Sequence, residues 1–125
     1  MKVLIADDDR VLSQLICSVL RQAGHKPFPA FDAMQALMLA MRDPPDMVLL
    51  DVNMPGGSGL KTLNTLKSSN KTSEIPVIVV SGNEDATIPD TVKQLGAARF
   101  VPKPIDPEVL LKVIREVMEE EGIAG

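Results

Sequence analysis

The chain lacks several residue types on which whole classes of protein depend. It has a single cysteine, Cys17, so an internal disulfide is excluded and a reducing compartment, the cytoplasm, is the expected location. Tryptophan and tyrosine are absent and phenylalanine occurs only three times, which leaves no aromatic platform for single-stranded nucleic acid. A net charge of −4 also argues against direct nucleic-acid binding through a basic surface.

Long apolar runs are absent as well. The first apolar run ends at Ala6 and acids follow at once, which is not the pattern of a signal peptide. No run is long enough to cross a bilayer, so we expect no membrane contact. The 125 residues suffice for one domain with a buried core. We expect a single domain over residues 1–125, with 119–125 as a frayed end or the start of a linker.

What the chain does contain is a regular alternation of short apolar runs and amphipathic segments. The runs predict strands at 2–6, 26–28, 47–50, 76–80 and 99–101. The segments between and after them predict helices that follow Asp9, Asp32, Ser58, residue 87 and Asp106. Five βα units in this order predict an α/β fold with a doubly wound parallel sheet.

Proline and methionine add local expectations. Pro27 and Pro29 suit only the edge or the end of a strand, because proline has no amide hydrogen to donate. Pro89 is compatible with a helix only in its first turn, which predicts a short helix over 88–95 after a mobile loop at 82–87. We expect the methionines of the second helix, Met34, Met38 and Met41, to pack in the core, with an adaptable binding face as the alternative.

Polar residues follow the strands directly. Asp7 and Asp8 follow the first strand, Asp51 the third, Ser81 the fourth and Lys103 the fifth. The carboxyl ends of parallel strands share one edge of a sheet, where ligands bind. Crowded carboxylates repel one another unless a cation joins them, and oxygen ligands favour Mg²⁺, with Mn²⁺ as an alternative. Phosphoryl transfer needs mainly positioning and charge neutralisation, and an Asp nucleophile, a hydroxyl donor and a lysine match that reaction.

The segments that carry these residues resemble the response regulator receiver family over the whole chain. They are Asp7–Asp8, the stretch DVNMPGGSG at 51–59, Ser81–Gly82 and Lys103–Pro104. The stretch is similar to the family's D-x-x-M-P-x-x-x-G phosphorylation loop, with a turn at 55–57. Each segment alone is common, but their order and their positions at strand ends are specific. The resemblance implies a flavodoxin-like (βα)5 fold with strand order 2-1-3-4-5.

The resemblance also implies a role for each acid. Asp51 would accept a phosphoryl group from a histidine kinase. Asp8, Asp51 and the main-chain carbonyl of Asn53 would ligate Mg²⁺, and Asp7 would act through water. The domain would catalyse its own phosphorylation and dephosphorylation and would not otherwise be an enzyme.

The switching residues follow from the same resemblance. Ser81, where the family more often has Thr, would follow the phosphoryl group, and Lys103 would contact it, with the Lys103–Pro104 peptide cis. Phe100 stands where the family has a switching aromatic residue, often Tyr, so its signal would come from packing. Asn53 and Asn83 occupy the positions that modulate dephosphorylation in the family.

The implied partners are a histidine kinase or phosphotransfer protein and a downstream protein or fused effector. The partner surface would be built from the fourth helix, the fifth strand and the fifth helix, and a homodimer through this surface is an alternative. His25 lies outside every motif, and we expect a structural role for it.

Three other functions compete with this interpretation. A receiver-like interaction module that is never phosphorylated would usually lack an acid or the lysine, and here all are present. A haloacid-dehalogenase-type phosphohydrolase would need a second Asp at position 53, where this chain has Asn53, and a cap domain. A flavin carrier would need a phosphate-cradling loop after the first strand in place of acids.

Overall fold

The computed structural model describes residues 1–54, 58–82 and 84–124, and strands alternate with helices along the chain. In chain order the elements are β1 (Lys2–Ala6), α1 (Arg10–Gln22), β2 (Lys26–Ala30), α2 (Ala33–Arg42), β3 (Met47–Leu50), α3 (Gly59–Ser68), β4 (Val77–Ser81), α4 (Ile88–Gln94), β5 (Arg99–Pro102) and α5 (Pro107–Glu121). The predicted alternation is confirmed.

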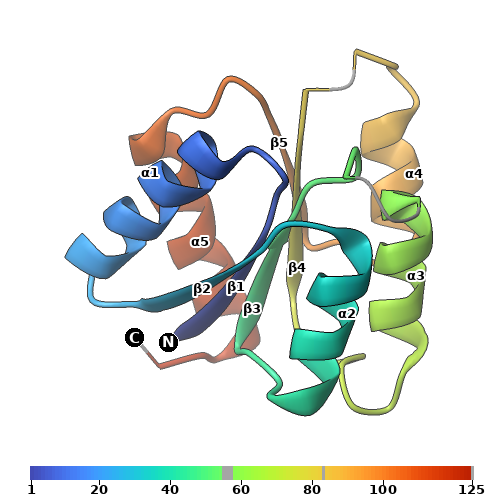
Figure 1. Ribbon diagram of the computed structural model, residues 1–125, viewed down its shortest axis with the longest axis horizontal. Coiled ribbons are helices and arrows are strands. Elements are labelled where there is room, and N and C mark those ends of the chain that lie inside the picture. The colour runs from blue at the N-terminus through green and yellow to red at the C-terminus, as the bar shows by residue number, and fades with distance from the viewer. Residues whose placement is uncertain (55–57, 83, 125) are drawn as a thin grey trace.

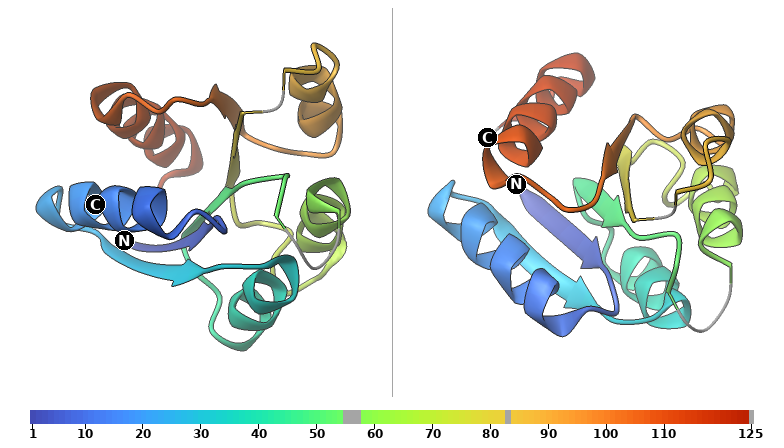
Figure 2. Two further views of the ribbon diagram at one scale, coloured as in Figure 1. Left: turned by 45° about the horizontal axis from the view of Figure 1, so that its top comes forward. Right: turned by 90° about the horizontal axis from the view of Figure 1, so that it is seen from above.

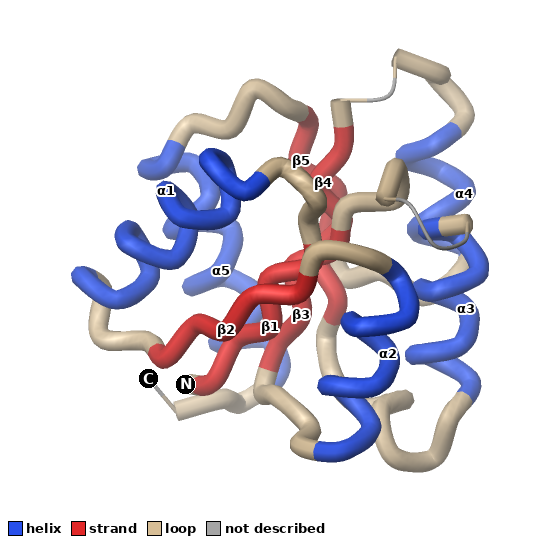
Figure 3. Tube along the Cα trace, in the orientation of Figure 1, coloured by secondary structure: helices blue, strands red, loops and turns tan. Residues whose placement is uncertain are grey.

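The strands form one parallel sheet in the order β2-β1-β3-β4-β5, as the resemblance implied (Figures 1 and 3). The chain runs outward from β1 in both directions, because β1 pairs with both β2 and β3. The strand order therefore reverses between β1 and β3. In doubly wound sheets this position leaves a crevice for ligands at the carboxyl ends of the strands.

Helices cover both faces of the sheet. Helices α1 and α5 lie on one face, and α2, α3 and α4 lie on the other (Figures 1 and 2). Strand β3 is buried throughout and alternates between the two layers: Met47 and Leu49 pack toward α1 and α5, and Val48 and Leu50 toward the opposite helices. A strand buried on both faces explains why this segment is a continuous apolar run.

The helix starts follow the predicted caps. Asp9, Asp32, Ser58 and Asp106 each accept a hydrogen bond from a backbone N–H in the first turn of the helix that follows. Pro89 lies in the first turn of α4, where its missing amide hydrogen costs nothing. The four caps and Pro89 therefore set the position at which each loop at the carboxyl edge gives way to a helix.

Strand β2 is longer than predicted and lies at the edge of the sheet. The N–H of Lys26 donates to Met1 O at 2.8 Å, and Ala30 O accepts from the N–H of Asp7 at 3.0 Å. Because successive residues alternate, Pro27 and Pro29 face the open edge, so no ladder hydrogen bond is lost. The prolines thus allow a five-residue strand and also block pairing with another strand there.

The prediction that the methionines of α2 pack in the core was wrong for two of them. Met34 is 66% exposed and Met38 is 61% exposed, whereas Met41 is half-buried. Small residues fill the core-facing side of α2 instead, namely Ala33, Ala36 and Ala40. Helix α2 therefore packs closely on the sheet and presents its larger apolar side chains to solvent.

Helix α5 continues through Glu121 and ends at Gly122, which has a left-handed backbone with φ of 68°. Residues 119–121 are therefore helical, and the expectation of a frayed end or the start of a linker over 119–125 stays a prediction. Among the described residues, no helix combines the length and apolar character that a bilayer span requires.

Two predictions fall on residues outside those that the structure describes. The turn at 55–57 is one, and the role of Asn83 is the other. The mobile loop at 82–87 includes residue 83 and stays a prediction.

Candidate functional site

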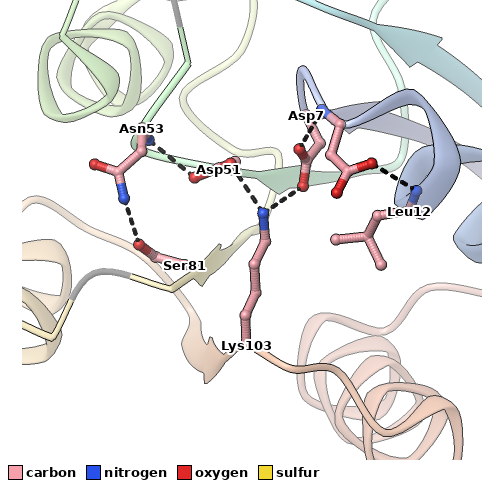
Figure 4. A network of polar contacts seen from close by, with 7 residues as sticks. Asp7, Leu12, Asp51, Asn53, Ser81 and Lys103 are labelled. Atoms are coloured by element: carbon pink, nitrogen blue, oxygen red, sulfur yellow. Dashed lines mark hydrogen bonds and ion pairs between the residues drawn. The ribbon is translucent and has the colours of Figure 1, made fainter.

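The polar residues predicted to meet at the carboxyl edge of the sheet do so. Asp7 follows β1, Asp51 follows β3, Ser81 ends β4 and Lys103 follows β5. Figure 4 shows their side chains converging from these separate elements. Backbone hydrogen bonds set the register, because the N–H of Asp51 donates to Ala6 O at 2.9 Å and that of Lys103 donates to Ser81 O at 3.0 Å.

Lys103 connects two of the acids. Its Nζ lies 2.9 Å from Asp7 Oδ2 and 3.1 Å from Asp51 Oδ2. Partial burial on its own would lower the pKa of Lys103, but the hydrogen bonds and negative charges of Asp7 and Asp51 outweigh that effect and raise the pKa above its ordinary value. The ammonium group therefore stays charged and neutralises part of the acidic cluster.

The buried carboxylates also accept backbone hydrogen bonds. Asp7 is 3% exposed and Asp51 is 5% exposed. Asp7 Oδ1 accepts from the N–H of Asp9, and Asp51 Oδ1 accepts from the N–H of Asn53, each at 2.9 Å. These bonds fix the direction of each carboxylate. On Asp51, both oxygens point toward a donor, so the group is held in one orientation.

Asp8 completes a group of three acids that fits a metal ion. One carboxylate oxygen from each of Asp7, Asp8 and Asp51 lies within 4.8 Å of the others. Asp7 and Asp51 are buried while Asp8 is exposed, so the group opens to solvent on one side. An oxygen-only set with room for water is the kind of site that suits Mg²⁺. The donor set therefore fits the expected cation.

Ser81 lies on the other side of Asp51 and is 1% exposed. Its Oγ accepts a hydrogen bond from Asn53 Nδ2 at 3.1 Å (Figure 4). Sequence reasoning had assigned Asn53 only a main-chain contact to the metal and an effect on dephosphorylation, and it missed this side-chain contact. No pattern in the sequence indicates it, since the two residues are 28 positions apart.

Gly59 controls the path of the chain after Asp51. A Cβ atom at this position would lie 2.1 Å from the Cα of Val52, a distance that real structures do not tolerate. Only glycine therefore lets the first turn of α3 lie against the backbone that follows Asp51. This close contact explains why the last residue of the 51–59 motif is glycine.

Phe100 and His25 lie apart from this cluster. Phe100 is half-buried on β5, opposite Val79 of β4, and packs at the border of the core. His25 Nδ1 lies 3.3 Å from the terminal amine of Met1, and burial together with that charge lowers the pKa of His25. The prediction of a structural role for His25 agrees with this position. The Lys103–Pro104 peptide is cis, as the resemblance implied.

The arrangement has the parts of a phosphoryl-transfer site. The buried carboxyl group of Asp51 lies beside an ammonium group, a hydroxyl group and two further acids that can share a divalent cation. Cationic groups and hydrogen-bond donors around one nucleophilic oxygen can neutralise the charge of an incoming phosphoryl group.

Comparisons with known proteins agree with this geometry. The model of the response regulator receiver domain matches residues 3–115. Protein PilH of Pseudomonas aeruginosa is 34% identical over 117 residues, which cover 94% of this chain and 97% of PilH. The phosphate regulon transcriptional regulatory protein PhoB of Escherichia coli is 33% identical over 119 residues, covering 94% of this chain but only 51% of PhoB.

Solved structures give the same fold. A CheY-like receiver domain protein from Methanospirillum hungatei superposes with a TM-score of 0.91 and 23% identity, covering 99% of this chain and 98% of that one. The family match, the relatives and the fold thus agree along nearly the whole chain. The protein belongs to the family of response regulator receiver domains.

Proposed function

We propose that this receiver domain accepts a phosphoryl group on Asp51 in a Mg²⁺-dependent reaction and thereby switches a partner-binding surface. The observation that carries the proposal is the convergence of Asp51 with Lys103, Ser81 and two further acids at one edge of the sheet. The donor would be a histidine kinase or a phosphotransfer protein, from which the phosphoryl group leaves a histidine nitrogen.

In the proposed reaction, an oxygen of the Asp51 carboxylate forms a bond to phosphorus as the bond from phosphorus to the donor nitrogen breaks. The leaving nitrogen keeps the electron pair of that bond. Lys103 Nζ, already 3.1 Å from Asp51 Oδ2, would neutralise an oxygen of the arriving group. Mg²⁺, held by Asp8, Asp51 and the main-chain carbonyl of Asn53, with Asp7 acting through water, would supply further charge neutralisation. Mn²⁺ is the alternative cation.

The chain would act only on its own aspartate. Asp51 phosphorylation and dephosphorylation would be self-catalysed, and no second substrate is proposed. Transfer to Asp51 needs positioning and charge neutralisation more than a separate acid or base.

Ser81 would then donate a hydrogen bond to the phosphoryl group. In the structure its hydroxyl oxygen accepts from Asn53 Nδ2. A phosphoryl group on Asp51 would accept a hydrogen bond from the Ser81 O–H and draw the end of β4 toward it. Phe100 pairs opposite Val79 on the neighbouring strand, so a shift of β4 would change its packing. Phosphorylation would thereby bias two conformations of the domain.

The proposed output surface comprises α4, β5 and α5. An ion pair joins Arg99 of β5 to Glu120 of α5, and a cavity of about 410 Å³ between α4 and β5 is lined in part by Pro89, Lys93 and Phe100. A cavity beside the switching aromatic residue gives it space to move. The partner would be a downstream protein or a fused effector, and a homodimer through this surface is the alternative.

Intact mass spectrometry tests the proposal. The chain is incubated with acetyl phosphate and Mg²⁺, with a chelator in a parallel sample. We expect one added phosphoryl group, absent without metal and absent in Asp51→Asn. The matched control is Asp106→Asn, which also replaces an acid by its amide but at a helix cap, where Asn serves as well as Asp.

A folded chain that gains no phosphoryl group and binds no beryllofluoride would contradict the proposal. That outcome would support the alternative function, a receiver-like interaction module that is never phosphorylated.

A further inference from the structure

A second surface, separate from both the acidic cluster and the proposed output surface, combines exposed apolar side chains with two arginines. We call it the α2 groove and define it by Arg10, Phe31, Asp32, Met34, Met38, Leu39 and Arg42. It is an open hollow of about 780 Å³ that extends along α2 from the first turn of α1. Figure 2 shows that turn beside the loop that leads from β2 to α2.

The apolar part of the α2 groove is formed by α2 and the residue before its cap. Met34 and Met38 are four positions apart, so their side chains lie one above the other on the same side of the helix. They are 66% and 61% exposed, while Phe31 and Leu39 are half-buried. Flexible methionine side chains over a more fixed apolar floor can adapt to the apolar face of a partner.

The arginines stand at the two ends of this apolar strip. The Arg10 guanidinium lies 4.0 Å from the centre of the Phe31 ring, so that ring holds it at one end. Arg42 is the last residue of α2 and stands at the other end. Within residues 1–54, 58–82 and 84–124, neither arginine forms a salt bridge. Both charges are therefore available to a partner.

The acids near these arginines are already engaged elsewhere. Asp32 Oδ1 accepts from the N–H of Gln35 at 2.7 Å, and Asp9 Oδ1 accepts from the N–H of Leu12 at 3.0 Å. Asp43, next to Arg42, pairs with Lys2 at 2.5 Å. Asp32 keeps its negative charge, so the lining holds two arginines and one acid, an excess of one positive charge. Two arginines fall short of the cluster of basic residues that binds nucleic acid or an anionic membrane, which disfavours both as occupants.

We propose that the α2 groove binds an acidic amphipathic helix of a partner protein. The apolar face of that helix would cover Met34 and Met38, and its carboxylates would meet Arg10 and Arg42. The ten residues of α2 span about 15 Å, so acids about two to three turns apart on the partner helix would reach both arginines. Helix-in-groove recognition of this kind needs apolar anchors at helical spacing with charges beside them.

A display library of randomised 16-residue helical peptides, selected on the full unphosphorylated chain, tests the proposal. We expect the enriched peptides to carry Asp or Glu beside apolar residues at i and i+3 or i+4. Their amide chemical-shift changes should map to α2 and the first turn of α1. Arg42→Glu should weaken binding about tenfold or more, and Met38→Ser should weaken it several-fold.

Matched controls make the test decisive. Lys112→Glu and Val109→Ser on α5 change an exposed cation and an exposed apolar residue elsewhere, and they should leave peptide affinity unchanged. No enrichment, enrichment of basic peptides, or binding that Arg42→Glu leaves intact would each overturn the proposal. Asp51→Asn should bind the peptides as well as wild type does, so the test does not depend on phosphorylation.

Discussion

At the amino end of the sheet Lys2 pairs with Asp43, whereas at the carboxyl end Lys103 lies between Asp7 and Asp51. The side chains of the first pair are 31% and 72% exposed, and an exposed pair contributes about 0–1 kcal/mol to stability. The second group includes acids whose side chains are 4% and 5% exposed. Burying charged groups costs free energy, and a stable fold does not need buried charges. The difference supports the proposal that the carboxyl end holds its charges for phosphoryl transfer.

The largest effect is expected from Gly59→Ala. Its Cβ would lie 2.1 Å from the Val52 Cα, so α3 or the segment after Asp51 must move. We expect a loss of about 3 kcal/mol or more in the free energy of unfolding, measured by urea denaturation. Gly82→Ala is the control, because its Cβ would find its nearest neighbour at 3.6 Å. Equal stability of the two variants would contradict this reason for the glycine.

Lys103→Met should have the next largest effect. We expect a loss of roughly 2 kcal/mol without Mg²⁺, because removing one partner of a buried ion pair costs about 3–5 kcal/mol and Lys103 keeps some contact with solvent. Mg²⁺ should restore more stability to this variant than it adds to wild type. Lys2→Met at the amino end should cost no more than about 1 kcal/mol. Equal losses at the two ends would abolish the contrast between them.

The pH dependence of Lys103 sharpens the same contrast. Its pKa is raised in the folded state, so its stabilising contribution is complete below the ordinary lysine value. That contribution is lost as the pH rises through the folded pKa, in the alkaline range above about 10.5. Urea denaturation from pH 9 to pH 11.5 should therefore show a steeper loss in wild type than in Lys103→Met. If stability fell equally with pH in wild type and in Lys103→Met, the raised pKa of Lys103 would be contradicted.

Asn53→Ala should have a smaller effect, on the affinity for a phosphoryl mimic. Removing Nδ2 releases the Ser81 hydroxyl from a bond whose net contribution is about 1 kcal/mol. We expect beryllofluoride to bind about threefold to tenfold more tightly, measured by calorimetry, because the bond from Asn53 would no longer oppose a movement of Ser81 toward Asp51. In a Ser81→Ala background the same substitution should leave the affinity for beryllofluoride unchanged. An equal effect in both backgrounds would show that Asn53 acts independently of Ser81.

The smallest effect is expected at the amino end, from His25. Burial and the terminal amine lower its pKa in the folded state, so the unfolded chain binds a proton first as the pH falls. Stability should therefore decline slightly as the pH drops through about 6.5, the ordinary histidine value. His25→Gln should flatten the free energy of unfolding between pH 7 and pH 5. If His25→Gln left the pH dependence of the free energy of unfolding unchanged, the lowered pKa of His25 would be contradicted.

The sequence predicted the sheet and the convergence of the site because both follow from local patterns. Apolar runs define strands, and residues placed directly after parallel strands must share one edge. Asp7, Asp51, Ser81 and Lys103 are therefore found where their positions in the chain predicted. The caps at Asp9 and Asp106 were predictable for the same reason, since they depend only on the next few residues.

Features that depend on tertiary packing were not predictable. Met34 and Met38 were placed in the core because they are apolar, but the alanines of α2 already fill the space against the sheet. The contact between Asn53 and Ser81 depends on how two loops from different strands approach each other. Strand β2 was predicted too short, because the sequence alone does not show that both of its prolines face the open edge.

The central claim is that the charges at the carboxyl end make Asp51 the phosphoryl acceptor. Peptide-level mass spectrometry after brief treatment with acetyl phosphate and Mg²⁺ tests it most directly, because it locates the modified residue. We expect the phosphoryl group only on the peptide that contains Asp51, with Asp43 and Asp46 at the amino end unmodified. A phosphoryl group on another carboxylate, or none on a chain shown to be folded, would contradict the claim.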